Sequence, residues 1–152
     1  MTTQNLIAVY KVIKSSNATN TPQNTRYFHG ISSETVNSKQ LCMHMIDIPS
    51  GSRAKVHKHE KHETAIYVIS GEAYTFFGDR LEHVEKTMAG DMLFIPANVP
   101  HFPVNIGSES AIGIVARTDP NELEAVVLLP ELETLADEVL ATLKNQVQIN
   151  SF

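Results

Sequence analysis

Short apolar runs, many of them alternating with polar residues and separated by Gly, Pro, Asn or Asp, fill most of this chain. Alternation with a period of two places successive side chains on opposite faces of a β-strand. These runs predict strands over residues 6–13, 41–48, 53–60, 64–70, 72–77, 81–88, 91–95, 101–104 and 111–117. Because the strands are short and no helical pattern separates them, they predict an all-β fold of antiparallel sheets, either double-layered or closed.

The pattern changes after Pro120, towards the C-terminus. Residues 131–146 have apolar side chains at helical spacing, namely Leu132, Leu135, Ala136, Val139, Leu140 and Leu143. Pro130 suits the first turn of a helix, and Lys144 near the other end complements the helix dipole. We therefore expect an amphipathic C-terminal helix. Its apolar face must be covered, either by the outside of the β-structure or by another subunit.

Three histidines occur on the predicted strands. His57 and His59 are two residues apart, so their side chains lie on one face of a strand. His101 comes from a later strand. Imidazole is a common ligand of Zn, Cu, Fe and Ni, and a metal site with an open position can bind substrate or O2. His57, His59 and His101 are therefore candidate ligands of a metal ion.

The residues around these histidines resemble the two paired motifs of the cupin superfamily. Gly51, His57, His59 and Gly71 match the first motif, and Gly90, Pro96, His101 and Asn105 match the second. Asn98 stands where the family usually has glycine, and Asn is a good replacement for Gly at a left-handed turn position. The departure from the family pattern at this position is therefore mild.

The resemblance implies a fold, a domain organisation and a cofactor. The fold would be a cupin jelly-roll β-barrel, or double-stranded β-helix, with its core at about residues 41–117 and the C-terminal helix at about residues 131–146. A single domain would span residues 1–152. One divalent metal ion, either Zn, Mn, Fe or Ni, would lie inside the mouth of the barrel.

The fourth ligand of this site stays open between two residues. Thr64 occupies the place where the family has a ligand glutamate, and Glu63 comes one residue earlier. A shift of one residue along a strand moves a side chain to the other face, so Glu63 reaches the metal only if the strand begins later or is bulged. His62 would share the face of Thr64. We expect either His62 or Glu63 to complete the site.

The longer resemblance, over residues 59–103, is to small single-domain cupins likened to mannose-6-phosphate isomerases. It implies a metal-dependent enzyme that acts on a small oxygenated molecule such as a sugar or sugar acid, as an isomerase or epimerase. The metal would polarise a carbonyl group, and an unligated His62 or Glu63 would move the proton. Two alternatives are an iron-dependent dioxygenase and a non-catalytic, metabolite-binding cupin.

Composition narrows the possible partners. The 152 residues carry a net charge of −5 with scattered basic residues, so we expect no nucleic-acid partner. No apolar run approaches the roughly 18 residues of a membrane span, and the N-terminus does not resemble a secretion leader. The single cysteine, Cys42, agrees with a reducing compartment. We expect a cytoplasmic homodimer that contacts its partner through the first strand or the terminal helix and binds a small-molecule substrate.

Three further side chains are interpreted from their place on the predicted strands. Tyr67 and Phe94 are expected to be packing residues rather than substrate contacts. Arg117, at the end of the last strand, is expected to form an ion pair with Asp119. The alternative for Arg117 is a contact with an acidic substrate.

Overall fold

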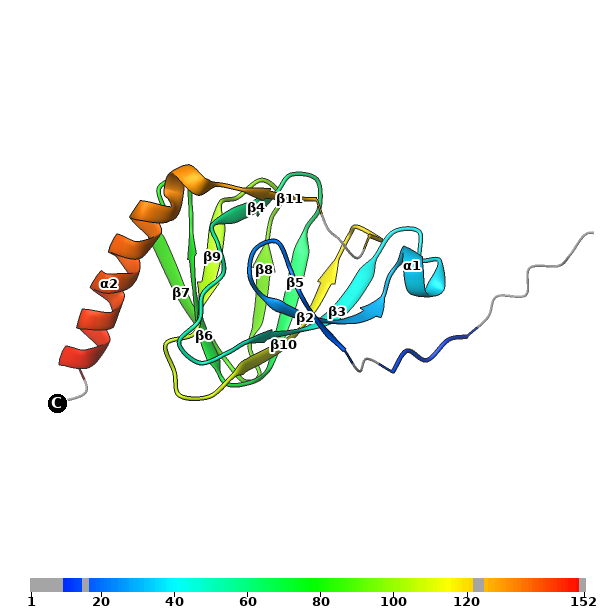
Figure 1. The fold of residues 1–152 in the computed structure, drawn as a ribbon, viewed down its shortest axis with the longest axis horizontal. Coiled ribbons are helices and arrows are strands. Elements are labelled where there is room, and N and C mark those ends of the chain that lie inside the picture. The colour runs from blue at the N-terminus through cyan, green and yellow to red at the C-terminus, as the bar shows by residue number, and fades with distance from the viewer. Residues whose placement is uncertain (1–9, 15–16, 122–124, 151–152) are drawn as a thin grey trace, which may run out of the picture.

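Two antiparallel sheets facing one another form the body of the protein in the computed structural model, which describes residues 10–14, 17–121 and 125–150 (Figure 1). The large sheet contains, in spatial order, β1 (Ala18–Asn20), β2 (Arg26–Ile31), β3 (Cys42–Ile48), β10 (Ala111–Arg117), β5 (Thr64–Ser70) and β8 (Met92–Ile95). The small sheet contains β11 (Val126–Leu128), β4 (His57–His59), β9 (His101–Val104), β6 (Glu72–Phe77) and β7 (His83–Met88).

The chain crosses repeatedly between the two sheets. It runs from β4 in the small sheet to β5 in the large one, back to β6 and β7, and then on to β8, β9 and β10 in alternation. This is the jelly-roll arrangement, and it confirms the predicted all-β cupin fold. Among the described strands no ladder joins one sheet to the other, so the structure is a sandwich rather than a fully closed barrel.

The strands expected between residues 41 and 117 are all present, although the one expected over 53–60 is shorter, as β4. The first expected strand, over residues 6–13, is not observed where it can be assessed: residues 10–13 have no regular secondary structure, and residues 6–9 lie outside the described part of the chain. The structure also contains strands β1, β2 and β11, which were not predicted, and the four-residue helix α1 (Ser33–Val36), which begins with a capping box formed by Ser32 and Thr35.

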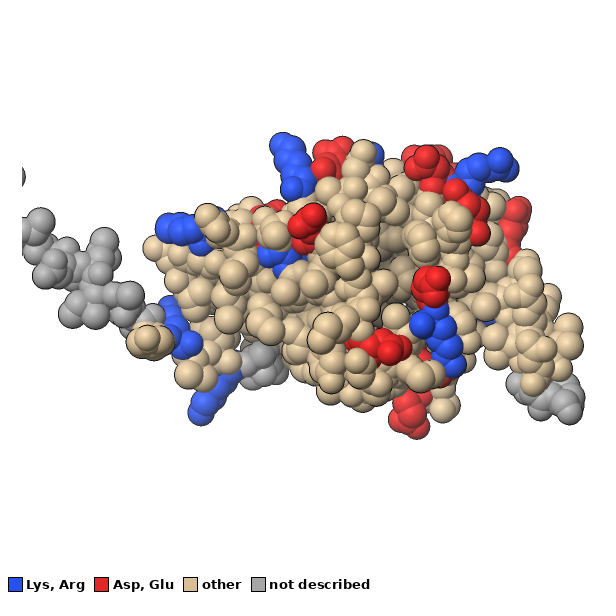
Figure 2. All heavy atoms as spheres, turned by 180° about the vertical axis from the view of Figure 1, so that it is seen from behind, with Lys and Arg blue, Asp and Glu red and all other residues tan. Residues whose placement is uncertain are grey.

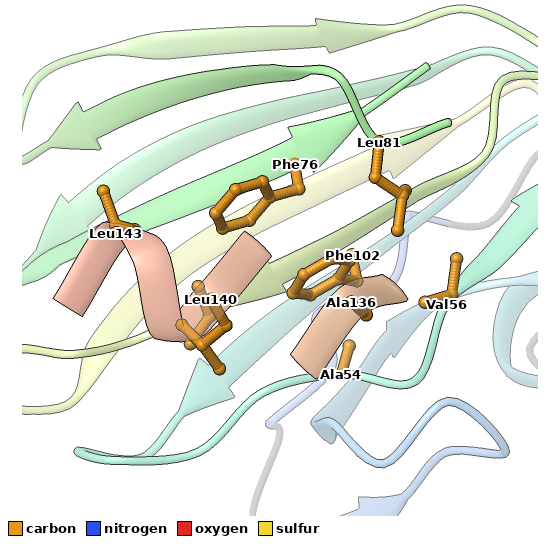
Figure 3. Packing of buried hydrophobic residues seen from close by; sticks show 9 residues of the cluster. Ala54, Val56, Phe76, Leu81, Phe102, Ala136, Leu140 and Leu143 are labelled. Carbon is orange, nitrogen blue, oxygen red and sulfur yellow. The ribbon is translucent and has the colours of Figure 1, made fainter. Parts of the chain in front are cut away.

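Helix α2 (Glu133–Ile149) follows a single 3-10 turn, η1 (Pro130–Leu132), and covers the outer face of the small sheet (Figure 3). Ala136, Leu140 and Leu143 of the helix are buried in one cluster with Phe76 and Phe102 of the sheet. The two phenylalanine rings stack with their centroids 5.0 Å apart. The apolar face of the helix is therefore covered by the outside of the β-sandwich, which was the first of the two expected possibilities.

Arg53 connects the first turn of α2 with the small sheet through polar contacts. Its Nη2 donates to Glu133 Oε2 at 2.7 Å and to Asp137 Oδ1 at 2.8 Å, and its guanidinium lies 5.4 Å from the centre of the Phe102 ring. Glu133 Oε1 also accepts a hydrogen bond from the Val56 N–H at 2.7 Å. These contacts position the N-terminus of the helix over β4 and β9.

The outer face of the large sheet is apolar and exposed among the described residues. Tyr67, Met92 and Phe94 project from β5 and β8 with 45%, 82% and 59% of their surface accessible. The interpretation of Tyr67 and Phe94 as packing residues therefore fails within one chain. Alternation correctly excludes them from the interior, but it says nothing about whether the outer face is covered.

The face seen in Figure 2 has no separate acidic or basic patch among its described residues. Acidic and basic residues are interspersed there, many of them around the edge of the view (Figure 2). No helix in the described part of the chain is long and apolar enough to span a membrane.

Candidate metal centre

Two neighbouring strands of the small sheet bring three histidines together. His57 and His59 point inward from β4, and His101 begins β9 directly opposite His57. Each histidine offers one ring nitrogen such that the three nitrogens all lie within 4.8 Å of one another. All three side chains are buried. The candidate ligand residues are therefore assembled by the pairing of strands that are distant in sequence.

Backbone carbonyl groups fix the rings of His57 and His101. His57 Nδ1 lies 2.7 Å from the Lys55 carbonyl oxygen, and His101 Nδ1 lies 2.9 Å from the Val99 carbonyl oxygen. A carbonyl oxygen can only accept, so in each neutral ring Nδ1 carries the proton and Nε2 keeps its lone pair. This is the tautomer and orientation that a metal ligand requires.

Burial keeps the three imidazoles neutral. It lowers the pKa of His57 to about 3 and that of His101 to about 4, in both cases against the hydrogen bond to the backbone carbonyl, which raises the pKa. The pKa of His59 is also lowered, first by burial and then by His57 and His101. At neutral pH the site therefore presents unprotonated nitrogen donors, the form that binds metal.

His62 and Glu63, the two candidates for a fourth ligand, differ in their placement. The His62 side chain is buried, with its ring centroid 4.6 Å from that of His59, and its Nδ1 lies 3.5 Å from Asp119 Oδ2. Glu63 is exposed, and its backbone N–H donates to Thr118 Oγ1 at 3.1 Å. Neither belongs to the three-histidine group, but His62 is the candidate that lies beside it.

The histidines line a cavity of about 70 Å³ between the two sheets. Much of its wall is aliphatic, including Ile46, Ile48, Val68 and Ile95. Thr64 also lines the cavity, and its buried Oγ1 has no hydrogen-bond partner among the described residues. Thr64 occupies the position at which the cupin motif has a ligand glutamate. It adds a neutral hydroxyl group to the wall of the cavity.

Arg117 is a cavity residue that the sequence interpretation placed elsewhere. The residue is 4% exposed and lines the same cavity as the three histidines, and its Nη2 donates to the Tyr27 hydroxyl oxygen. Asp119, its expected partner, lies beside His62 instead. Alternate residues of β10, starting with Ala111, point inward, and Arg117 is one of them. The inward direction of Arg117 could therefore have been predicted from the alternation along this strand.

Comparison with known proteins gives one family match. The family model described as "Cupin domain" matches residues 44–116, which include the three histidines. A search of curated proteins found no match.

Solved structures share the fold at low sequence identity. Oxalate decarboxylase from Lactobacillus farciminis, in a formate complex, is 22% identical with a TM-score of 0.63, over 74% of this chain and 33% of that chain. The Bacillus subtilis oxalate decarboxylase studied for its Mn(II) centres is 22% identical with a TM-score of 0.58, over 79% and 30%. A protein proposed to be a sugar phosphate isomerase, from Acidithiobacillus ferrooxidans, is 21% identical with a TM-score of 0.54, over 77% and 73%.

The aligned region spans about a third of the length of the oxalate decarboxylase chains. At this level of identity the similarity establishes a common fold and leaves the activity of this chain open. The fold, the matched family model and the two histidine-bearing motifs agree with one another, and they identify residues 44–116 as a cupin domain.

Proposed function

We propose that His57, His59 and His101 hold one divalent metal ion, and that the protein is a metal-dependent enzyme acting on a small oxygenated molecule. The reaction is an isomerisation or epimerisation of a sugar or sugar acid. The observation that carries this proposal is the set of three buried, neutral imidazoles with ring nitrogens within 4.8 Å of one another.

The donor set fits a metal ion because the lone pairs are available and the rings are oriented. The carbonyls of Lys55 and Val99 hold the Nδ1 protons of two ligands and leave their Nε2 atoms for the metal. Three nitrogen ligands suit Zn, Fe or Ni, and the similarity to an oxalate decarboxylase with Mn(II) centres adds Mn. When bound, such an ion acts as a Lewis acid that polarises a substrate carbonyl.

His62 has two possible roles beside this site. It could be the fourth ligand, or it could move a proton to or from the substrate while Asp119, at 3.5 Å, orients its ring. Metal content separates the two roles: a fourth ligand makes the His62→Gln variant bind metal more weakly, whereas a proton-moving residue leaves metal content unchanged and lowers kcat.

An iron-dependent dioxygenase is the second candidate function. The aliphatic residues that line the cavity favour a substrate with fewer hydroxyl groups than a sugar. A three-histidine site with open positions also permits iron and O2. The identity of the metal distinguishes the two functions, because O2 activation needs a redox-active ion and isomerisation does not.

The test is the metal content of protein purified without added metal. We expect about one ion per chain in the wild type, its loss in His57→Ala and His101→Ala, and its retention in the control His83→Ala, which alters an exposed histidine. Iron favours the oxygenase, and zinc or manganese favours the isomerase. Folded protein that is metal-free and takes up none of these ions would overturn both functions and leave a non-catalytic, metabolite-binding cupin.

A further inference from the structure

The cavity of the three histidines has two ends that differ in chemistry. In the large sheet, β5 lines the cavity from Thr64 to Val68. Short connections relate the two sheets: four residues join His59 of β4 to Thr64, and Gly71 alone joins β5 to β6. The histidine end of the small sheet therefore meets Thr64, and the opposite end of the cavity lies between Val68 and Ala73 of β6.

Polar groups are concentrated at the histidine end. His57, His59 and His101 supply three ring nitrogens there. Thr64 adds a buried hydroxyl group that has no hydrogen-bond partner among the described residues. A buried hydroxyl group without a partner costs free energy, so an oxygen atom of a bound molecule is a favourable neighbour for it. This end is therefore suited to the oxygenated part of a substrate.

Hydrocarbon groups line the opposite end and close it. Ile48 and Ala111 of the large sheet lie opposite one another and form a buried cluster with Ala73 of the small sheet. Thr87 also lines this end, but its hydroxyl group donates to the Ala73 carbonyl oxygen at 3.4 Å. A substrate hydroxyl at this end would lose its hydrogen bonds to water, whereas a methyl group would gain from burial.

The volume of the cavity limits the length of the substrate. Ile66, Val115 and Thr75 line its middle part, and the whole cavity has a volume of about 70 Å³. A water-sized group needs about 10–15 Å³ of such space, so the cavity holds roughly five to seven groups of the size of water, methyl or hydroxyl. A six-carbon sugar has about twelve such groups and exceeds this space.

We propose that the substrate is a short hydroxycarbonyl compound with its oxygen atoms at one end and a hydrocarbon tail at the other. The oxygen atoms lie at the histidines and Thr64, and a tail of about one to three carbons points to Ile48 and Ala111. The inference rests on the proposed function, because the metal ion would bind the oxygen atoms, and it narrows the substrate to short molecules without a hydroxyl group at the far end. Ile48 and Ala111 then determine specificity, because they limit the length of the tail.

Calorimetric titration with four hydroxyketones tests this substrate class. 1-Hydroxy-2-butanone and dihydroxyacetone are matched in size and differ in a terminal methyl or hydroxyl group. We expect dihydroxyacetone to bind at least about 10-fold more weakly, because its second hydroxyl group is buried among hydrocarbon groups. Hydroxyacetone should bind about 3- to 4-fold more weakly than 1-hydroxy-2-butanone, which buries one more methylene group. 1-Hydroxy-2-heptanone is too long and should bind at least about 10-fold more weakly than 1-hydroxy-2-butanone.

Two variants change the apolar end in opposite directions. Ile48→Ala lengthens the cavity and should bring the affinity for 1-hydroxy-2-heptanone to within about threefold of that for 1-hydroxy-2-butanone. Ala111→Val shortens it and should weaken binding of 1-hydroxy-2-butanone about 10-fold while leaving that of hydroxyacetone unchanged. Ile69→Ala, which removes the same side chain from the exposed face of β5, is the control and should bind all four ketones as the wild type does.

Equal affinity of the wild type for 1-hydroxy-2-butanone and dihydroxyacetone would overturn the proposal, and so would a lack of binding by all four ketones. If a variant does not fold, the four ketones in the wild type still decide. Metal content is measured on the same samples, and the titrations are repeated without metal. Metal-loaded protein that does not distinguish methyl from hydroxyl would remove this inference and leave the proposed function. Protein that takes up no metal but prefers 1-hydroxy-2-butanone would support the apolar end of the cavity and remove the proposed function.

Discussion

Phe94 and Phe102 are the same residue type in strands of equal length, and both point away from the space between the sheets, yet one is 59% exposed and the other is fully buried. The difference is helix α2, which covers Phe102 in the small sheet and leaves the large sheet uncovered within the described chain. Alternation along a strand therefore assigns a side chain to a face. Whether that face is buried depends on an element elsewhere in the sequence.

Truncating the two phenylalanines should give the largest difference in stability between the covered face and the exposed face. Phe102→Ala leaves a cavity under α2 and should lower the free energy of unfolding by about 3–5 kcal/mol. Phe94→Ala removes little buried area within one chain and should change it by less than about 1 kcal/mol in dilute protein. Urea unfolding measures both. Equal losses would mean that the face around Phe94 is covered within the monomer.

Metal addition should stabilise the chain through the inner face of the small sheet. Zinc at about 100 times its dissociation constant should raise the free energy of unfolding by about 2.7 kcal/mol. The His101→Ala variant, which lacks the partner opposite His57, should gain little. Thermal unfolding with and without zinc, with His83→Ala as the control, checks this. Equal stabilisation of both variants would place the ion elsewhere.

The attachment of α2 should depend on Arg53 to a smaller extent. Arg53→Met removes two charge-assisted hydrogen bonds from partly buried groups and should lower the free energy of unfolding by about 1–2 kcal/mol. Asp137→Asn alters only the more exposed partner, whose side chain is 70% accessible, and should cost less than about 0.5 kcal/mol. Hydrogen exchange in the first turn of α2 should rise in Arg53→Met alone.

Acid should destabilise the metal-free protein through histidines on both inner faces. Burial lowers the pKa of His57 to about 3 and that of His101 to about 4 in the small sheet; in the large sheet, burial and then Arg117 lower that of His44 to about 4. Between pH 6.5 and 4 the unfolded chain binds more protons than the folded one, so stability falls as the pH falls through that range.

The contribution of His44 can be isolated because it lies in the other sheet. His44→Leu should reduce the slope of stability against pH by up to about 1.4 kcal/mol per pH unit within this range. Chemical unfolding at a series of pH values measures the slope in metal-free protein. A variant with the wild-type slope would mean that His44 takes up its proton equally in the folded and unfolded states, so that folding does not lower its pKa.

Local sequence patterns sufficed for much of the fold. The strands at residues 64–70, 72–77, 101–104 and 111–117 are present with the expected bounds, because each has a regular apolar pattern closed by turn residues. The three histidines are brought together as expected, since the motif spacing encodes both the strand face and the pairing of β4 with β9.

The contacts that sequence analysis missed are non-local. Tyr27, whose hydroxyl accepts from Arg117, lies in β2, far from Arg117 in the chain, and nothing in the local sequence links the two. The same holds for Asp119 beside His62 and for β11, a three-residue edge strand that pairs with β4. The expected ion pair of Arg117 with Asp119 relied on proximity in sequence, which strand geometry overrode.

The crossing of the chain between the sheets has a consequence for folding kinetics. His57 and His101 become neighbours only when β4 and β9 pair, after the chain has passed through both sheets and closed a long loop. Contacts of this kind form slowly, because loop closure costs entropy before the contact forms. Metal added during refolding should therefore bind in the last phase, and its binding rate would report when the sandwich is complete.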